Sequence, residues 1–153
     1  MTTAAIASWK QVTDRLEKTL TDFSEADLQR QVAPGRNRIY YLIGHLAAVS
    51  DRMLPLLFLG DRLYPEFDDP FLTQPDRTVP DAFSPADLKL SLTAINQKLT
   101  EAFDNMPAED WFKRHNAVSD EDFAKEPQRN RLAVLLSRTN HMSFHLGQML
   151  LVK

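Results

Sequence analysis

The sequence predicts an all-α fold, a four-helix bundle, and three observations support this prediction. Four segments repeat apolar residues at spacings of three and four, which is the period of an amphipathic helix. No segment shows the alternation of apolar and polar residues that is typical of a half-buried strand. No internal repeat of fixed length appears, which argues against a solenoid. A four-helix bundle is the all-α architecture that fits all three.

The first predicted helix covers residues 4–23. Its apolar stripe consists of Trp9, Val12, Leu16, Leu20 and Phe23. Ser24 followed by Asp27 then resembles a capping box that opens a short turn, because each residue can bond the backbone N–H of the other. Pro34-Gly35 punctuates the chain before the next periodic segment.

The second predicted helix covers residues 38–58. Its apolar stripe consists of Ile39, Leu42, Leu46, Val49 and Met53. Pro55 is expected to kink or end this helix, because proline has no N–H for the backbone ladder.

Residues 60–83 form a long predicted connection with no sustained period. Prolines recur in it at positions 65, 70, 75 and 80. Fully extended, it could reach about 80 Å, whereas the helix before it is roughly 30 Å long. The connection can therefore cross the whole bundle, which allows the helices on either side of it to run parallel. Long ordered loops of this kind often cover a site.

The third predicted helix runs from a cap at Ser84 to Pro107. Pro85 suits the first helical position, and Asp87 supplies an acidic third position. The apolar stripe consists of Leu88, Leu92, Ile95, Leu99, Phe103 and Met106. Residues 107–127 mix charged and aromatic residues without a clear period.

The fourth predicted helix covers residues 129–151. Its stripe consists of Leu132, Leu135, Thr139, Met142, Leu146, Met149 and Leu150. No convincing strand remains anywhere in the chain.

Composition indicates one domain over residues 1–153. The chain is 43% hydrophobic and contains no cysteine, and its length suits one ordinary core without disulfides. Its formal charge is −3 and no basic stripe appears, which argues against nucleic-acid binding. Neither a signal peptide nor a membrane-spanning stretch is found, so we predict a cytoplasmic protein without a membrane partner. Any thiol chemistry would need a thiol from outside the chain.

Three of the four histidines lie in predicted helices, His45 in the second and His141 and His145 in the fourth. Two histidines four residues apart share a helix face, so both imidazoles can address one metal ion. All three flank apolar stripes and can converge between helices. Neutral imidazoles suit zinc, nickel, iron or copper rather than magnesium or calcium, and we favour zinc or nickel. Three ligands leave a coordination position open for catalysis; hydrogen-bonded, metal-free histidines are the alternative.

The fourth histidine, His115, lies in a predicted loop. The acidic residues Glu66, Asp68 and Asp69 of the long connection could supply an oxygen ligand or a base. Solvation at the surface is the preferred interpretation for all three, and no general base is assigned.

Other residues near the histidines have open roles. Arg52 and Arg138 could hold an anionic substrate or lie in solvent. Gln148 could bond a metal-bound ligand or anchor its neighbour, or it could be a solvated or capping residue. Gly44 and Gly147 are costly inside helices, which indicates either helix packing, the preferred explanation, or close backbone approach at the site.

Three sequence segments resemble the DinB/YfiT-like metalloenzyme superfamily. They are the linker SEADLQRQVAPGRNRIYYLIGHL, its end YLIGHLAAV with His45, and the later NHMSFHLGQM with His141 and His145. The resemblance implies a four-helix bundle with up-down-down-up topology, and these three histidines as its metal ligands. It also implies, from some related proteins, a transferase or isomerase that uses a low-molecular-weight thiol.

Two classes of function follow. The first is a metal-dependent enzyme that acts on a small molecule, with a low-molecular-weight thiol as cosubstrate. The second is a non-catalytic module that binds a metal or a small ligand, for example in a stress response. A structural or interaction protein with metal-free histidines is a third hypothesis. A homodimer formed through exposed helix surface is compatible with all of them.

Overall fold

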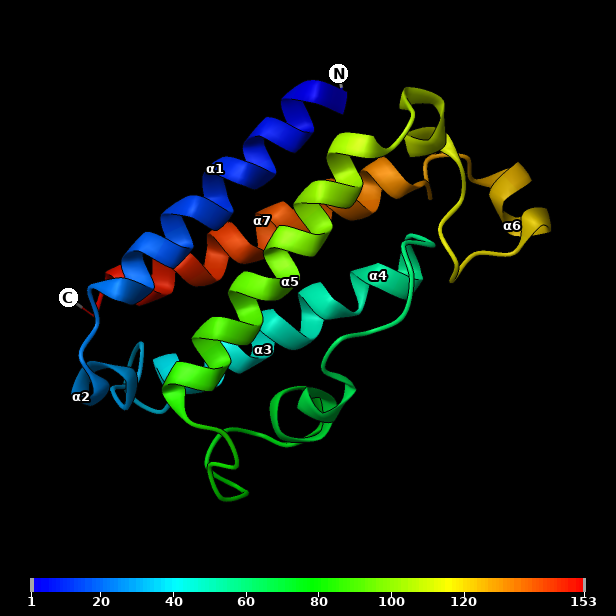
Figure 1. Cartoon of the computed structure of the whole chain (residues 1–153). Helices are drawn as coiled ribbons and strands as arrows, with labels where there is room; N and C mark the ends of the chain where they lie inside the picture. The colour runs from blue at the N-terminus through cyan, green and yellow to red at the C-terminus, as the bar shows by residue number, and fades with distance from the viewer. Residues whose placement is uncertain (1, 153) are drawn as a thin grey trace.

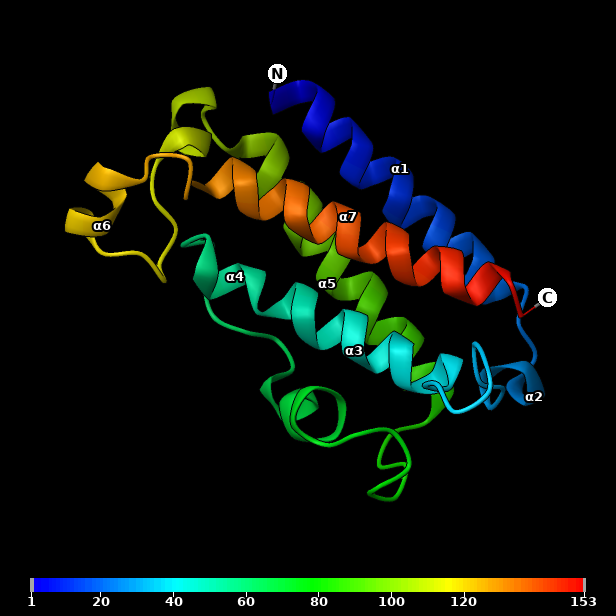
Figure 2. The same cartoon turned by 180° about the vertical axis from the view of Figure 1, so that it is seen from behind.

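The computed structural model describes residues 2–152, and its four long helices form a bundle (Figure 1). They are α1 (Thr2–Thr21), α3 (Ile39–Asp51), α5 (Pro85–Asn105) and α7 (Arg131–Leu150). α1 packs against α5 and α7, and α3 packs against the same two helices. In Figures 1 and 2, α3 and α5 run in one direction and α1 and α7 in the other. The described residues contain no strand, which confirms the all-α class.

Six short helical segments lie in the connections. They are α2 (Glu25–Leu28), α4 (Met53–Leu56), η1 (Pro65–Phe67), η2 (Asp69–Thr73), η3 (Ala108–Phe112) and α6 (Asp120–Lys125). Residues 107–127, for which the sequence predicted no element, contain η3 and α6. Over residues 2–152, no helix has the length and apolar character needed to cross a membrane.

The apolar stripes of the long helices meet in one hydrophobic core. Trp9 of α1 is fully buried; its ring meets that of Phe103 edge to face at 5.6 Å between centroids. The Trp9 Nε1–H donates to Thr100 Oγ1 at 3.3 Å. Leu46 of α3 and Met142 of α7 are buried in the same core. Burial of each such side chain is worth about 1.5–3 kcal/mol, which offsets the conformational entropy lost on folding.

Side-chain caps begin four of the described helices, α2, α5, α6 and α7. Ser24 Oγ accepts a hydrogen bond from the Asp27 N–H, and the Asp27 carboxylate accepts one from the Ser24 N–H. The predicted capping box is therefore confirmed, and it opens α2. Ser84 caps α5 by accepting from the Asp87 N–H at 3.1 Å, as expected, and the side chain of Asn130 caps α7.

The helix predicted over residues 38–58 is interrupted. α3 ends at Asp51, and α4 follows after one intervening residue. Pro55 explains the break, because it has no N–H for the carbonyl of Asp51 four residues earlier and its ring crowds that carbonyl. The helix also stops at Leu56, since Phe58 adopts a left-handed backbone with a φ of 60°.

The long connection over residues 60–83 begins at the carboxyl end of α3. Asp51 is fully buried there. Its carboxylate accepts hydrogen bonds from the backbone N–H groups of Leu63 and Tyr64, at 2.8 and 3.0 Å, and from Arg62 Nε at 3.0 Å. Burial without partners would make this carboxylate costly, so the three donors fix where the connection starts.

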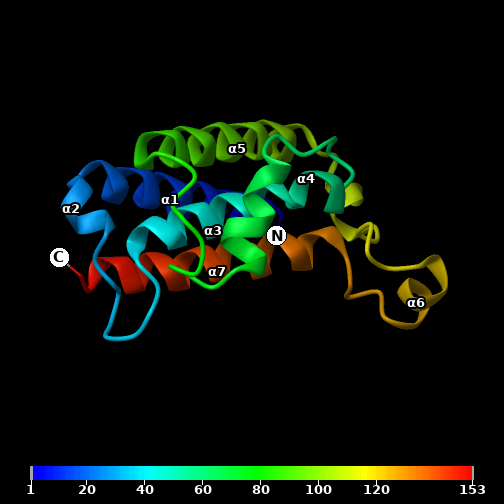
Figure 3. The same ribbon diagram turned by 90° about the horizontal axis from the view of Figure 1, so that it is seen from below.

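The same connection ends beside the amino end of α3. Arg38 donates to the carboxylates of Asp76 and Asp81, at 2.7 and 2.8 Å from Nη2. The hydroxyl of Tyr40 donates to the backbone carbonyl of Phe83 at 2.8 Å. The connection thus runs back along α3 (Figure 3). It returns the chain to the end where α3 begins, so α5 starts there and runs parallel to α3.

Candidate metal centre

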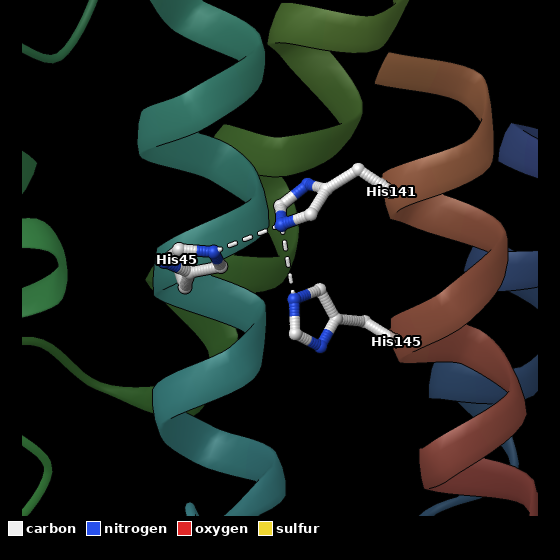
Figure 4. A group of neighbouring side chains, drawn as sticks. All are labelled: His45, His141 and His145. Carbon is white, nitrogen blue, oxygen red and sulfur yellow. Dashed lines mark hydrogen bonds between the residues drawn. The ribbon is translucent and has the colours of Figure 1, made fainter. Parts of the chain in front are cut away.

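The structure brings His45, His141 and His145 together between α3 and α7 (Figure 4). His141 and His145 project from successive turns of α7, and His45 faces them from α3. The His141 Nε2 atom lies 3.2 Å from His45 Nε2 and 3.1 Å from His145 Nε2. The predicted convergence of the three histidines is therefore found.

Two of the rings are oriented by hydrogen bonds through Nδ1. His45 Nδ1 lies 3.1 Å from the backbone carbonyl of Phe71, and His145 Nδ1 lies 2.8 Å from Gln148 Oε1. Both oxygens can only accept, so each Nδ1 carries the proton and each neutral ring turns the lone pair of its Nε2 inward. Carbonyl and amide partners of this kind are typical of metal-ligating histidines. Gln148 therefore anchors its neighbour, one of the roles left open by the sequence.

The spacing of the three nitrogens fits a divalent transition metal. Tetrahedral zinc with Zn–N bonds of about 2.0–2.1 Å separates neighbouring nitrogens by about 3.3–3.4 Å. The two observed separations of 3.1 and 3.2 Å are close to that value, and all three ligand atoms lie within 4.8 Å of one another. Without a cation, only a shared proton relieves the repulsion between such close lone pairs. The group of ligand atoms could thus hold one metal ion.

The acidic residues of the long connection do not join this group over the described residues. Asp68 accepts hydrogen bonds from Arg62 and Arg52, both at 2.7 Å. The Asp69 carboxylate accepts one from the Gln74 side chain at 3.4 Å. Asp68 and Asp69 thus bond neighbours rather than reach the histidines.

The two arginines that the sequence singled out differ in their surroundings. Arg52 is paired with Asp68 and its side chain is 54% exposed. Arg138 is half-buried, and its Nε is a buried atom without a hydrogen-bond partner. Of these two arginines, Arg138 is therefore the one without an ion-pair partner among the described residues.

Gly44 allows Phe71 to approach α3 closely. A Cβ at position 44 would lie 2.5 Å from three atoms of the Phe71 ring, whereas one at position 147 would meet nothing within 4 Å. Gly44 thus lets Phe71 bring its carbonyl to His45, so it combines helix packing with close approach at the site. The expectation of a packing or site role is wrong for Gly147, which is exposed.

A cavity of about 470 Å³ borders the histidines beside His145. Its lining includes Leu42 and Phe144 on the apolar side and Arg36 and Asn37 on the polar side. Phe144 is 61% exposed, and its ring meets that of His145 edge to face at 5.2 Å. A small molecule in this cavity would lie next to a metal ligand.

Sequence reasoning missed several residues of this site. Phe71, Tyr41 and Arg36 were not singled out, although Tyr41 stacks on the His45 ring at 6.3 Å between centroids. Phe71 and Arg36 lie in connections without a period, so no pattern could identify them. His115 lies between η3 and α6 and does not join the group of ligand atoms.

The environment lowers the pKa of all three histidines. Burial is the largest cause for each; together with the nearby His145, His45 and Arg138 it lowers the pKa of His141 from 6.5 to about 4. Burial also lowers the pKa of His45 and of His145, against the opposing effect of the hydrogen bonds to Phe71 and Gln148. The rings are therefore neutral near pH 7, which is the form that binds metals.

The metal-free protein should lose stability as the pH falls from about 6.5 towards 4. In this window the unfolded chain binds protons at its histidines, whose usual pKa is about 6.5, while folded His141 does not. Lower pH therefore favours the unfolded state. The melting temperature should fall more steeply between pH 7 and pH 5 in the wild type than in His141→Gln, which lacks this titration. If the melting temperatures of the two proteins fall equally between pH 7 and pH 5, the expectation is wrong.

The comparisons with known proteins agree with this architecture. The chain is similar in structure to a conserved protein from Enterococcus faecalis, with a TM-score of 0.68 and 20% identity, covering 99% of this chain and 94% of that one. At such an identity the likeness concerns the fold alone. No curated protein matches the sequence. A family model described as the DinB superfamily matches residues 8–149. Since this match covers most of the chain, the protein belongs to the DinB superfamily.

Proposed function

We propose that the protein is a metal-dependent enzyme that acts on a small molecule and uses a low-molecular-weight thiol as cosubstrate. The observation that supports this most is the convergence of three Nε2 atoms at 3.1 and 3.2 Å, two of them on rings oriented through Nδ1. His45, His141 and His145 would hold the metal, with zinc or nickel favoured.

Three protein ligands leave at least one coordination position open. The cation, when bound, lowers the pKa of a thiol or a water in that position and so supplies a nucleophile near neutral pH. The protein's contribution is to fix the ligands and to seat the substrate. Phe71 and Gln148 hold the rings of His45 and His145, and the cavity beside His145 has room for a small electrophile. The chain has no cysteine, so the thiol would come from solution.

The second candidate is a non-catalytic module that binds a metal or a small ligand. Its supporting observation is that the group of ligand atoms contains no carboxylate from residues 2–152. The protein therefore offers no carboxylate there to accept a proton. Under this hypothesis the cavity binds its ligand without turnover.

A turnover screen separates the two candidates. Zinc- and nickel-loaded protein should convert an electrophile in the presence of one of several biological thiols, and His145→Ala should lower the rate at least about a hundredfold, since the metal would be lost. His115→Ala is the matched control and should retain the wild-type rate. Equal turnover by the wild type and His145→Ala would contradict the proposed enzyme. Binding of the screened compounds without turnover by the wild type would favour the binding module.

A further inference from the structure

The guanidinium of Arg138 lies close to the candidate metal centre. Arg138 is one helical turn before His141, and its spacing places it on the same face of α7 as His141 and His145. Burial is the largest cause of the low pKa of His45 and of His141, and the charge of Arg138 lowers both further. The guanidinium therefore acts on imidazoles of both helices that form the site.

Half-buried Arg138 differs from three arginines with mostly buried side chains in having no carboxylate partner. Arg38 pairs with Asp76 at 2.7 Å, Arg62 with Asp51 at 3.0 Å. Arg131 likewise pairs with Asp110 at 3.8 Å. Over the described residues, no carboxylate forms an ion pair with Arg138, and its buried Nε has no hydrogen-bond partner. Buried donors in proteins are rarely left without an acceptor, so this Nε–H needs an explanation.

The surroundings of Arg138 favour the binding of an anion beside its guanidinium. Burial, and after it the charge of Arg52, lowers the pKa of Arg138. An arginine nevertheless stays protonated in proteins, so the charge persists. Arg52 cannot compensate it, because it is itself a cation and its partner Asp68 also bonds Arg62. An anion from outside the chain would satisfy the free Nε–H and the charge together.

We propose that Arg138 binds the carboxylate of the small molecule that occupies the three-histidine site. This inference rests on the proposed function, since the carboxylate belongs to the substrate or thiol cosubstrate of that site. The planar guanidinium favours a planar carboxylate, which it can bind through two parallel hydrogen bonds. Arg138 and His141 are only one turn apart, so a carboxylate and a metal-binding donor separated by one or two carbons would suit the site. Arg138 is thus assigned to substrate specificity, without any part in metal binding.

Mercaptoacetate, which carries both groups, and 2-mercaptoethanol, which lacks the carboxylate, test the proposal. Cobalt-loaded wild-type protein at fixed ionic strength should bind mercaptoacetate at least about tenfold more tightly, since charge-assisted hydrogen bonds are strong. The thiol-to-cobalt absorption band reports binding. In Arg138→Met this preference should disappear while the cobalt content and the affinity for 2-mercaptoethanol stay unchanged. Arg138→Lys keeps the positive charge but lacks the two parallel N–H donors of the planar guanidinium, so it should retain part of the preference.

Arg52→Met is the matched control, because it removes a neighbouring cation that already has a partner. It should keep most of the preference. An equal loss in Arg52→Met and Arg138→Met would assign the preference to general positive potential and overturn the role of Arg138. A preference that survives in Arg138→Met, or that is absent from the wild type, would overturn it as well.

The stability of the variant provides a readout that is independent of metal. Arg138→Met should fold with a melting temperature equal to or above that of the wild type, because it removes a half-buried charge that has no ion-pair partner and a buried Nε–H that has no acceptor. A lower melting temperature restored by Arg138→Lys would assign the residue a structural role instead.

If the wild type holds no cobalt, the proposed function fails separately. Acetate, but not acetamide, should still raise the melting temperature of the metal-free wild type and leave that of Arg138→Met unchanged; equal shifts in both proteins would refute the inference.

Discussion

Protein purified without a histidine tag should carry about one equivalent of a divalent transition metal per chain, and His45→Ala and His145→Ala should both lose it. Each substitution removes one of three ligands that meet at one point, and two remaining imidazoles hold such an ion far more weakly. Elemental analysis of the purified proteins measures the metal content directly. Loading should also raise the melting temperature of the wild type by roughly 10 °C when free zinc exceeds its dissociation constant about a thousandfold. Neither variant should show that increase.

His115→Ala is the control for this experiment. His115 lies outside the group of ligand atoms, so its removal should leave the metal content at the wild-type value. Retention of the metal by His45→Ala and His145→Ala would refute the three-histidine site. A wild type that binds neither zinc nor nickel after attempted loading would favour the hypothesis of metal-free histidines.

Gly44→Ala should destabilise the fold by about 1–3 kcal/mol, the usual cost of overpacking. The added methyl would lie 2.5 Å from the Phe71 ring. That ring is buried, and it contacts the rings of Tyr40, Tyr41, Phe67 and Phe83, which restrict its movement. The clash thus outweighs the gain of about 1 kcal/mol in helix propensity. Urea unfolding measures the change in the free energy of unfolding.

The same substitution should weaken metal binding about 10–100-fold, because displacement of Phe71 removes the carbonyl that orients His45. Gly147→Ala is the matched control, since a methyl there meets nothing within 4 Å. It should stabilise the protein by up to about 1 kcal/mol and leave metal affinity unchanged. If Gly44→Ala and Gly147→Ala have similar free energies of unfolding and metal affinities, the close approach of Phe71 has no functional role.

The elements that sequence reasoning predicted well depend on local signals. The four long helices were expected because their stripes repeat with the period of a helix, and their ends lie near the expected ones wherever a cap or a proline marks them. Ser84 and Pro55 are examples, since each acts through the few residues next to it. The short segments η1, η2, η3 and α6 were missed because each is too short to show a helical period in the sequence.

The candidate site, too, was predicted where spacing within a helix was informative and missed where distant segments meet. The spacing of His141 and His145 places them on one helix face, and the position of His45 at the edge of its own stripe identified the third member. The hydrogen-bond partners that orient these rings could be predicted from the sequence only in part. Gln148 lies one turn from His145 and was considered, whereas Phe71 contributes a backbone carbonyl from a connection without a period. No residue type marks a carbonyl as a hydrogen-bond partner, so only the folded chain could reveal it.

The sequence by itself determined the helical class, the faces that the helices bury and the three histidines that could meet, because all of these depend on periods and spacings within one helix. The tertiary structure decided the contacts between distant segments. It placed His45 Nε2 3.2 Å from His141 Nε2 across 96 residues of chain and packed Phe71 against Gly44. It also left half-buried Arg138 without a carboxylate partner of the kind that Arg38 and Arg62 have. The physical reason is that such contacts depend on how a proline-rich connection returns along α3, and the buried hydrogen bonds that fix its path join residues far apart in sequence.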